Sequence, residues 1–523
     1  MSLFAWSWIF LVIYIAGMVG FGFVAKRRIR SADDFATARR SYGPLFLALA
    51  YAATTASGAA FLGFPAIVYE HGLASLWAAV LYPGGIYFGV LVSMRLISNA
   101  GNSWGSRSIP EYLGNRFQSD GIRILVSIAS LLLFFYLAGQ LLSGLVIFEM
   151  MLGISAFWAL AVTSVVLLIY VSLGGAHADI LTDGVQGFLM VIVAVVVVVI
   201  FVTGAGLDGG RDTLVSRLTE LDPNLVGPLN KDSHLFHSWW SIAAQFIAHI
   251  PIGFLPHIGS KLWALKDDSQ RKRFFMFAAM FAFTLAMLGL GGASARAVLG
   301  DALFEPGSNP NQALPALFVR LFPTWLAAFV GVGVLAAVMS TADGLVVSSA
   351  QILSNDLYRR TFAPRFRQDL SEEELDRRVL VLSRWSTAGI LVICAMMAWL
   401  LMDRNVALLI WAGNGGLMAA FAGPLVLGSV WKGVTRAGAY AGLLSGLLSF
   451  IVLHTGLVPT HWFDGTFLFG VANWLQEEAP NPFSCAAIGE ILSVLITWLV
   501  SLVTRPLSEE HIAELFPAPP DPA

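Results

Sequence analysis

The chain has 523 residues, of which 57% are hydrophobic and only 12% are charged. Soluble domains carry about 25% charged residues, so this composition excludes an ordinary soluble protein. The net charge of −2 lacks the basic excess of nucleic-acid binders, so no nucleic acid is expected as a partner. The apolar runs are long and do not alternate, which predicts an all-α polytopic membrane protein.

The apolar runs predict about thirteen transmembrane helices, since each span needs roughly 20 apolar residues. The first run, residues 4–25, lacks a basic segment before it and a cleavage site after it, so we expect a span and not a signal peptide. Most of the 31 Lys and Arg residues, Lys261 among them, fall in loops on one side. The positive-inside rule therefore places the N-terminus outside and the C-terminus in the cytoplasm, with residues 504–523 as a cytoplasmic tail.

Two of the predicted spans contain weak helix formers near their centres. Residues 48–72 include a Thr-Thr-Ala-Ser-Gly run, and residues 243–261 include two prolines and two glycines. The two spans lie five apart and cross in opposite directions, as the halves of a five-helix inverted repeat would. Broken helices at matching places indicate a substrate site near the membrane midplane, although Gly and Pro also permit close helix packing.

The ninth predicted span carries polar residues in its middle. Ser340, Thr341 and Asp343 follow one another among Ala, Val and Leu, where lipid cannot satisfy their polar groups. Three oxygen donors within one helical turn suit a hard cation such as Na⁺. Serine and threonine can instead serve helix packing, but a carboxylate inside a membrane indicates a functional site.

Four segments of the sequence resemble the sodium:solute symporter family. They are FYLAGQLLSG (135–144), LTDGVQG (181–187), AAVMSTADG (336–344) and AAFAGPLVLGSVWKGVTRAGAYAGLLSG (419–446). The resemblance extends through all the predicted spans. It implies a LeuT-like fold in a single symporter domain, residues 1–523. The implied parts are an extra N-terminal span (4–25), two inverted repeats (45–205 and 237–430) and two extra C-terminal spans (436–503).

The resemblance also implies a sodium site between the broken second span and the ninth span. Its ligands would be the carbonyls of Ala53, Ala56 and Ala337 and the hydroxyls of Ser340 and Thr341. The residues agree with this assignment, because an unwound helix frees carbonyl oxygens. A site without a full carboxylate should bind sodium weakly enough to release it into the cytoplasm.

A second cation site occurs in some members of the family, built from a sixth-span Asp and ninth-span serines. Asp183 matches that Asp, but Asp343 and Gly344 stand at the serine positions. Asp183 and Asp343 could together hold a second cation, or share a proton, because close like charges raise one pKa. The alternative for Asp183 is a helix N-cap at the cytoplasmic start of the sixth span.

The family's substrate lies beside the two helix breaks, which here implies a small, mostly apolar pocket. Its candidate residues are Thr55, Ser57, Gly58, Gln140, Trp240, Gln245, His249 and Asn414. No Lys or Arg is expected in mid-span, so an anionic solute would use the half-helix N-terminus near the break. His249 could be a structural residue or could handle a proton or metal.

The sequence thus predicts a sodium-coupled importer that works by alternating access in the plasma (inner) membrane. Its solute would be a small monocarboxylate or similar organic acid, with an amino acid, a pantothenate-like vitamin or a sugar as alternatives, and a proton as the alternative coupling ion. The expected partners are the solute, sodium and the lipid bilayer, without an obligatory protein partner. An enzyme would need His177, Asp179 and Asp183 as a metal cluster, and their spacing is poor for that role.

Overall fold

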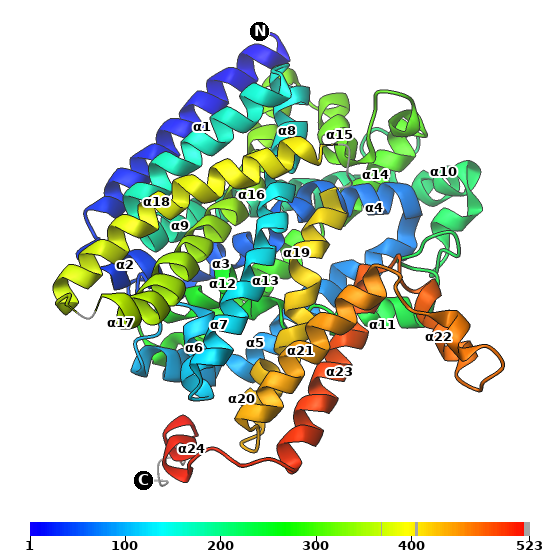
Figure 1. Ribbon diagram of the computed structural model, residues 1–523. Helices are drawn as coiled ribbons and strands as arrows, with labels where there is room; N and C mark the ends of the chain where they lie inside the picture. Colours follow the sequence, from blue (N-terminus) through cyan, green and yellow to red (C-terminus); the bar gives the residue numbers. More distant parts are fainter. Residues whose placement is uncertain (368, 403–405, 517–523) are drawn as a thin grey trace, which may run out of the picture.

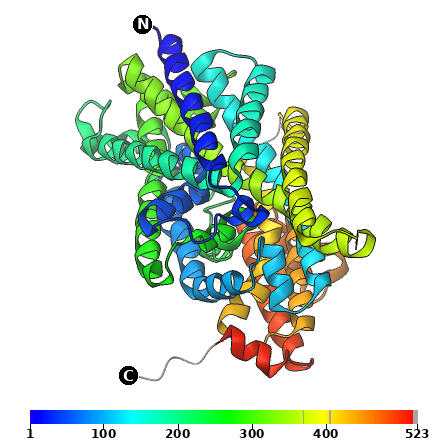
Figure 2. The same cartoon turned by 90° about the vertical axis from the view of Figure 1, so that its left-hand side faces the viewer.

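The computed structural model describes residues 1–367, 369–402 and 406–516. These residues form helices and no named strand, with one isolated bridge between Tyr42 and Leu265. The start of α1 (Leu3–Lys26) and α24 (Glu509–Leu515) lie at opposite ends of the molecule (Figures 1 and 2). The fold is therefore all-α, as the composition predicts.

Ten helices in the described part of the chain are long and apolar enough to cross a membrane. They become eleven if the bent pair Trp239–Phe254 and Pro256–Ala264 counts as one span. Two of the ten, Pro44–Ser103 with 60 residues and Ala156–Thr203 with 48, exceed the roughly 20 residues of one crossing. The count thus differs from the expected thirteen partly because these runs continue through residues where separate spans were predicted.

The second predicted span is broken, as its weak helix formers indicate. It starts as α3 (Pro44–Gly58), continues as the π-helical segment η1 (Ala59–Gly63) and ends as α4 (Phe64–His71). Ser57 has φ 55° and ψ 173°, a backbone conformation that is almost restricted to glycine. The break interrupts the helical hydrogen-bond ladder and leaves carbonyl groups near it for other partners.

The seventh predicted span is broken as well. Helix α11 (Trp239–Ile247) gives way to the 3₁₀ turn η6 (Ile252–Phe254), then to α12 (Pro256–Gly259) and η7 (Ser260–Ala264), with a bend of 55°. Proline lacks a backbone N–H and clashes with the preceding turn, so Pro251 and Pro256 account for the interruption.

Helix α16 (Thr324–Gln351) runs through the centre of the bundle and continues into the π-helical segment η11 (Ile352–Phe362). Every residue from Gly333 to Gln351 is buried, as expected for a helix enclosed on all sides. Its neighbours are α1, α3, α8 (Leu133–Leu152), α9 (Ala156–Thr203) and α18 (Glu372–Leu400). The polar residues of α16 therefore face protein and not lipid.

Helices α19 (Val406–Phe421), α21 (Arg436–His454) and α23 (Pro482–Leu502) pack together, and α19 also packs against α8 (Figure 1). A Cβ on Gly446 would lie 2.1 Å from the Ala419 carbonyl oxygen, so only glycine permits this approach. The other helices are α2 (Ala32–Thr37), α5 (Trp77–Ser103), α6 (Ile109–Arg116), α7 (Asp120–Ala129), α10 (Leu214–Leu221), α13 (Arg271–Ala286), α14 (Gly289–Leu299), α15 (Ala313–Leu321), α17 (Ala363–Phe366), α20 (Gly428–Val430) and α22 (Phe469–Glu477).

Candidate functional site

The hydroxyls of α16 meet the backbone carbonyls of α3 just before its break. Ser340 Oγ donates to the Ala337 carbonyl oxygen at 3.1 Å and to the Ala53 carbonyl oxygen at 3.3 Å. Thr341 Oγ1 donates to the carbonyl oxygen of Thr54 at 3.2 Å. The structure therefore brings four of the five expected sodium-site residues to this junction. The Ala56 carbonyl, the fifth, accepts the N–H of Ala59 across the break.

Three buried carboxylates lie directly beside this junction. One oxygen each from Asp179, Asp183 and Asp343 lies within 4.8 Å of the others. Asp343 Oδ2 accepts hydrogen bonds from the Tyr170 hydroxyl at 3.1 Å and from Thr182 Oγ1 at 3.0 Å. Asp183 and Asp343, expected to face each other, are thus brought together with a third acid.

Asp183 is not a helix cap, so that alternative is wrong. It lies inside the second of the two helices that meet at Gly175 in α9, well past the start of that helix. Gly175, with φ 47° and ψ −134°, has non-helical backbone angles, so α9 consists of two helices joined at a kink, close to the expected boundary between the fifth and sixth spans. His177 in turn bonds to the Tyr42 hydroxyl and does not join the carboxylates, which leaves no His-Asp-Asp metal cluster.

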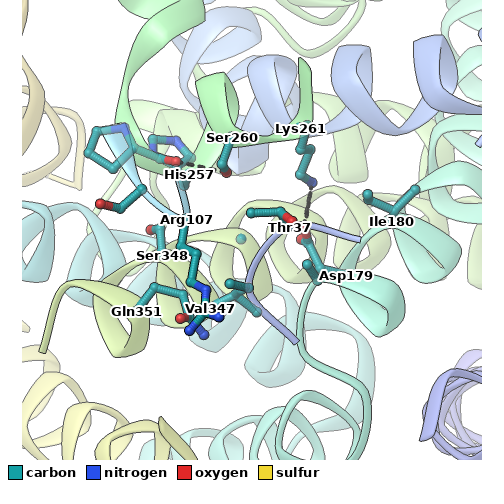
Figure 3. A pocket seen from close by; sticks show the side chains of 15 residues that line it. Thr37, Arg107, Asp179, Ile180, His257, Ser260, Lys261, Val347, Ser348 and Gln351 are labelled. Atoms are coloured by element: carbon teal, nitrogen blue, oxygen red, sulfur yellow. Dashed lines mark hydrogen bonds and ion pairs between the residues drawn. The ribbon is translucent and has the colours of Figure 1, made fainter. Parts of the chain in front are cut away.

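Lys261 is a buried residue of the site that the sequence analysis did not identify. The positive-inside rule predicts a cytoplasmic loop for this residue, but its side chain is only 2% exposed. Its Nζ bonds to Asp179 at 3.0 Å, to Thr54 Oγ1 at 2.6 Å and to Asp183. Figure 3 shows it reaching Asp179 from the neighbouring segment. The bend after α11 carries η7 inside the bundle, against α3, so Lys261 is buried at the end of the broken span and is not exposed in a loop. The sequence did offer one signal for such a lysine, namely acidic residues in apolar spans without an evident cationic partner.

A cavity of about 120 Å³ opens between the two helix breaks. Five of the eight expected substrate residues line it: Thr55, Ser57, Gln245, His249 and Asn414. The remaining lining is largely aromatic and aliphatic, and includes Tyr82, Tyr136, Trp411 and Phe483.

The other three expected residues lie outside the cavity lining. The Gln140 side-chain oxygen accepts the N–H of Gly58 at 3.1 Å, so this pair fixes the turn behind the break. Trp240 Nε1 donates to Ser484 Oγ at 2.6 Å and connects α11 to α23. These three residues therefore support the wall of the cavity but do not line it.

Polar groups without protein partners point to where a solute would be held. The side-chain nitrogen of Gln245 and the side-chain oxygen of Asn414 are buried and have no hydrogen-bond partner among the described residues. His249 Nδ1 faces the Gln245 carbonyl, so Nδ1 carries the hydrogen and Nε2 is the acceptor of the neutral ring. A buried polar group without a partner costs about 1–3 kcal/mol, which a matching solute would offset.

A second, much smaller pocket is lined in part by Lys261. It has about 10 Å³ of space and is lined by Arg107, Asp179, His257, Lys261 and Gln351, among others (Figure 3). That space holds about one water molecule. Both ring nitrogens of His257 and both amide atoms of Gln351 lack partners among the described residues, so this pocket is polar yet nearly closed.

Comparison with known sequences identifies relatives over most of the chain. A model of the sodium:solute symporter family matches residues 35–446. The sodium/proline symporter of Salmonella typhimurium is 30% identical over 467 residues, which cover 84% of this chain and 86% of that protein. The sodium/pantothenate symporter of Haemophilus influenzae is 26% identical over 450 residues, covering 85% and 89%.

Comparison with solved structures gives the same fold. A Na⁺-coupled sialic acid symporter in a substrate-bound, outward-open state has a TM-score of 0.74 at 17% identity, covering 96% of this chain and 99% of that one. Mhp1, a nucleobase-cation-symport-1 family transporter in a closed conformation, has a TM-score of 0.52 at 16% identity, covering 92% and 97%. At these identities the likeness concerns the fold alone. The family match shows that the chain belongs to the sodium:solute symporter family. It is therefore a sodium-coupled, multi-pass membrane transporter and not an enzyme.

Proposed function

We propose that this protein is a sodium-coupled importer of a small monocarboxylate or similar organic acid, working by alternating access. The observation that carries the proposal is the junction of α3 and α16, where Ser340 and Thr341 meet freed carbonyls next to the cavity. An ion bound at this junction would fix the broken helix that lines the cavity, so ion and solute would stabilise each other's sites.

The sodium site of this proposal has five oxygen ligands, the carbonyls of Ala53, Ala56 and Ala337 and the hydroxyls of Ser340 and Thr341. Three of these residues already contact one another through Ser340 Oγ. Sodium binding would turn the two hydroxyls so that their lone pairs, and no longer their hydrogens, face the carbonyl cluster. Hard oxygen ligands without a carboxylate fit a monovalent ion that must be released.

The size and lining of the cavity support a small, partly apolar solute. A cavity of about 150 Å³ holds benzene, so about 120 Å³ suits a solute with only a few heavy atoms. The Gln245 amide is one donor for a carboxylate. The Ser57 hydroxyl, at the start of the half-helix after the break in α3, is another. Proline and pantothenate, for which two relatives are named, both carry a carboxylate.

An amino acid is the second candidate, and His249 favours it. Its ring has the acceptor Nε2 free of the Gln245 bond, and the rings of Tyr82 and Trp411 lie 4.7 and 5.3 Å from it, centroid to centroid. An acceptor surrounded by aromatic rings suits an ammonium or hydroxyl donor. A sugar would need more polar partners than this cavity offers.

We also propose a single symporter domain, residues 1–523, with about thirteen spans and inverted repeats at 45–205 and 237–430. Dividing the run Pro44–Ser103 at the turn that begins with Gly72, and the run Ala156–Thr203 at Gly175, supports this number. The break at Ser57 and the 55° bend after α11 lie at matching places of the two repeats. The opposite positions of the start of α1 and of α24 support termini on opposite sides of the membrane (Figure 1), and the loop charges favour an outside N-terminus and a cytoplasmic C-terminus.

Uptake into proteoliposomes tests the proposal. Labelled monocarboxylates of two to four carbons, proline and glucose are offered with an inward sodium gradient, an inward proton gradient or neither. We expect the sodium gradient to concentrate a monocarboxylate and to leave glucose outside. Accumulation of proline alone would select the second candidate. Uptake driven by protons and indifferent to sodium would overturn the sodium coupling.

A further inference from the structure

We propose that the ammonium of Lys261 is the resident cation of the acidic cluster Asp179, Asp183 and Asp343, where it takes the place of a second sodium ion. Only the site between α3 and α16 would then exchange sodium during transport. The stoichiometric part of this inference rests on the proposed function, whereas the occupation of the cluster by Lys261 can be tested by ion binding alone.

The contacts of Lys261 are those of a coordinated cation. Its Nζ reaches Thr54 Oγ1 of α3 and Asp179 and Asp183 of α9, so an oxygen partner is available for each of its three N–H donors. The side chain is 2% exposed, which leaves no room for a hydration shell. A sodium ion in the cluster would need these same oxygens, and it would compete with a cation that is covalently tethered.

The charges of the cluster explain why some cation must be present. Asp183 is fully buried, and its Oδ1 has no partner among the described residues, although Oδ2 bonds to Lys261 and Thr54. Asp179 is 3% exposed. A buried carboxylate without a counter-charge is costly, so removal of the ammonium leaves a site that attracts another cation.

The α16 side of the cluster is poorly equipped to hold sodium while Lys261 is present. Gly344 contributes no side-chain oxygen, and a Cβ there would already lie 3.3 Å from Asp179 Oδ1. Asp343 Oδ2 is turned to Tyr170 and Thr182, and its Oδ1 accepts the N–H of Gly344 at 2.9 Å. The oxygens open to a cation are thus chiefly those that Lys261 already uses.

The Lys261 side chain also connects the two broken spans. Lys261 belongs to η7, at the end of the bent segment, while Thr54 is adjacent to Ala53 at the sodium junction. A resident cation therefore stays with the protein through the transport cycle, whereas a second sodium ion would leave with the solute. The account predicts one sodium ion for each solute molecule.

The test uses the purified full-length protein and two readouts. The first is the rise in thermal unfolding temperature when choline is replaced by sodium, and the second is the ratio of labelled sodium to labelled solute taken up by proteoliposomes. The variants are Lys261→Met, the double variant Lys261→Met with Asp183→Asn, and Lys266→Met, which is the same substitution at an exposed lysine five residues further along the chain.

The parent protein and Lys266→Met should show a flux ratio of one and the same sodium-induced shift. Lys261→Met should be less stable in choline and should gain a larger sodium-induced shift, with a flux ratio that rises towards two. The double variant, which removes both charges, should recover stability in choline and lose the added shift. The double variant keeps the test decisive even if Lys261→Met cannot be purified without sodium.

Two results would overturn the inference: a parent flux ratio of two, or a Lys261→Met protein whose sodium-induced shift equals that of Lys266→Met. A double variant as unstable as Lys261→Met would equally contradict it, because charge balance would then not be the role of the lysine. An absence of sodium-driven uptake in the parent protein would instead refute the proposed function, and the thermal shifts would still decide the role of Lys261.

Discussion

At the scale of single residues, hydroxyl oxygens carry the proposed sodium chemistry and an ammonium balances the acids beside them. Ser340, Thr341 and Asp343 could be identified from sequence because lipid cannot satisfy their polar groups. Lys261 could not, since a lysine after an apolar run normally extends to the membrane surface. Only the bend of the chain after α11 places it against Asp179 and Asp183.

Removing a hydroxyl at the α3–α16 junction should weaken sodium binding. Ser340→Ala and Thr341→Ala should each raise the sodium concentration for half-maximal uptake about tenfold or more, because a bond to a charged group is worth roughly 1.5–3 kcal/mol. Ser349→Ala, at a buried serine nine residues beyond Ser340 in α16, is the matched control and should change little. An unaltered sodium dependence in the Ser340/Thr341 double variant would refute the site.

Removing the unpaired amide in the cavity should weaken solute binding and leave sodium binding intact. Gln245→Leu should raise the solute concentration for half-maximal uptake about tenfold or more, since a hydrogen bond to an anion is lost. Trp240→Phe, which removes a hydrogen bond to Ser484 outside the cavity lining, should have a much smaller effect. Equal effects of the two substitutions would mean that Gln245 is only a wall residue.

At the scale of elements, the two broken spans were predictable because clustered Gly, Pro, Ser and Thr are weak helix formers. The close junction of two helices within α9 was not, because the non-helical residue Gly175 joins them without a loop. The identity of the cavity lining was only partly predictable. Gln140 and Trp240 lie on helices that border the cavity. Their hydrogen bonds to Gly58 and Ser484 keep their side chains out of the cavity lining.

The break in α3 should be strained when residue 57 is not glycine. Ser57 has φ 55° and ψ 173°, a region that costs of order 1–3 kcal/mol for other residues. Ser57→Gly should therefore raise the thermal unfolding temperature in detergent, whereas the β-branched Ser57→Val should lower it. A lower unfolding temperature for Ser57→Gly, or a higher one for Ser57→Val, would show that the break is relaxed in the purified protein.

At the scale of the whole molecule, charge predicted an orientation and hydropathy predicted the all-helical class. The number of spans could not be read reliably from apolar runs. Two runs in the structure are longer than one crossing, and one crossing is split by a 55° bend. The cavity lies where the two breaks meet, so the arrangement of the halves, and not any single segment, creates the site.

Cysteine labelling of intact cells should reveal the orientation. Arg211→Cys, between α9 and α10, should react with an impermeant thiol reagent added outside, and Glu373→Cys, at the start of α18, should not. The natural Cys394 and Cys485 are 0% exposed and should give little background. Labelling of Glu373→Cys alone would reverse the assigned orientation.

Sodium-dependent solute binding tests the central claim most directly. The affinity of the purified protein for its solute is measured by titration calorimetry in sodium and in potassium, and the affinity for sodium with and without solute. The account predicts that sodium raises solute affinity by the same factor by which solute raises sodium affinity, and that Ser340→Ala reduces both. A solute affinity that is identical in sodium and potassium would contradict it.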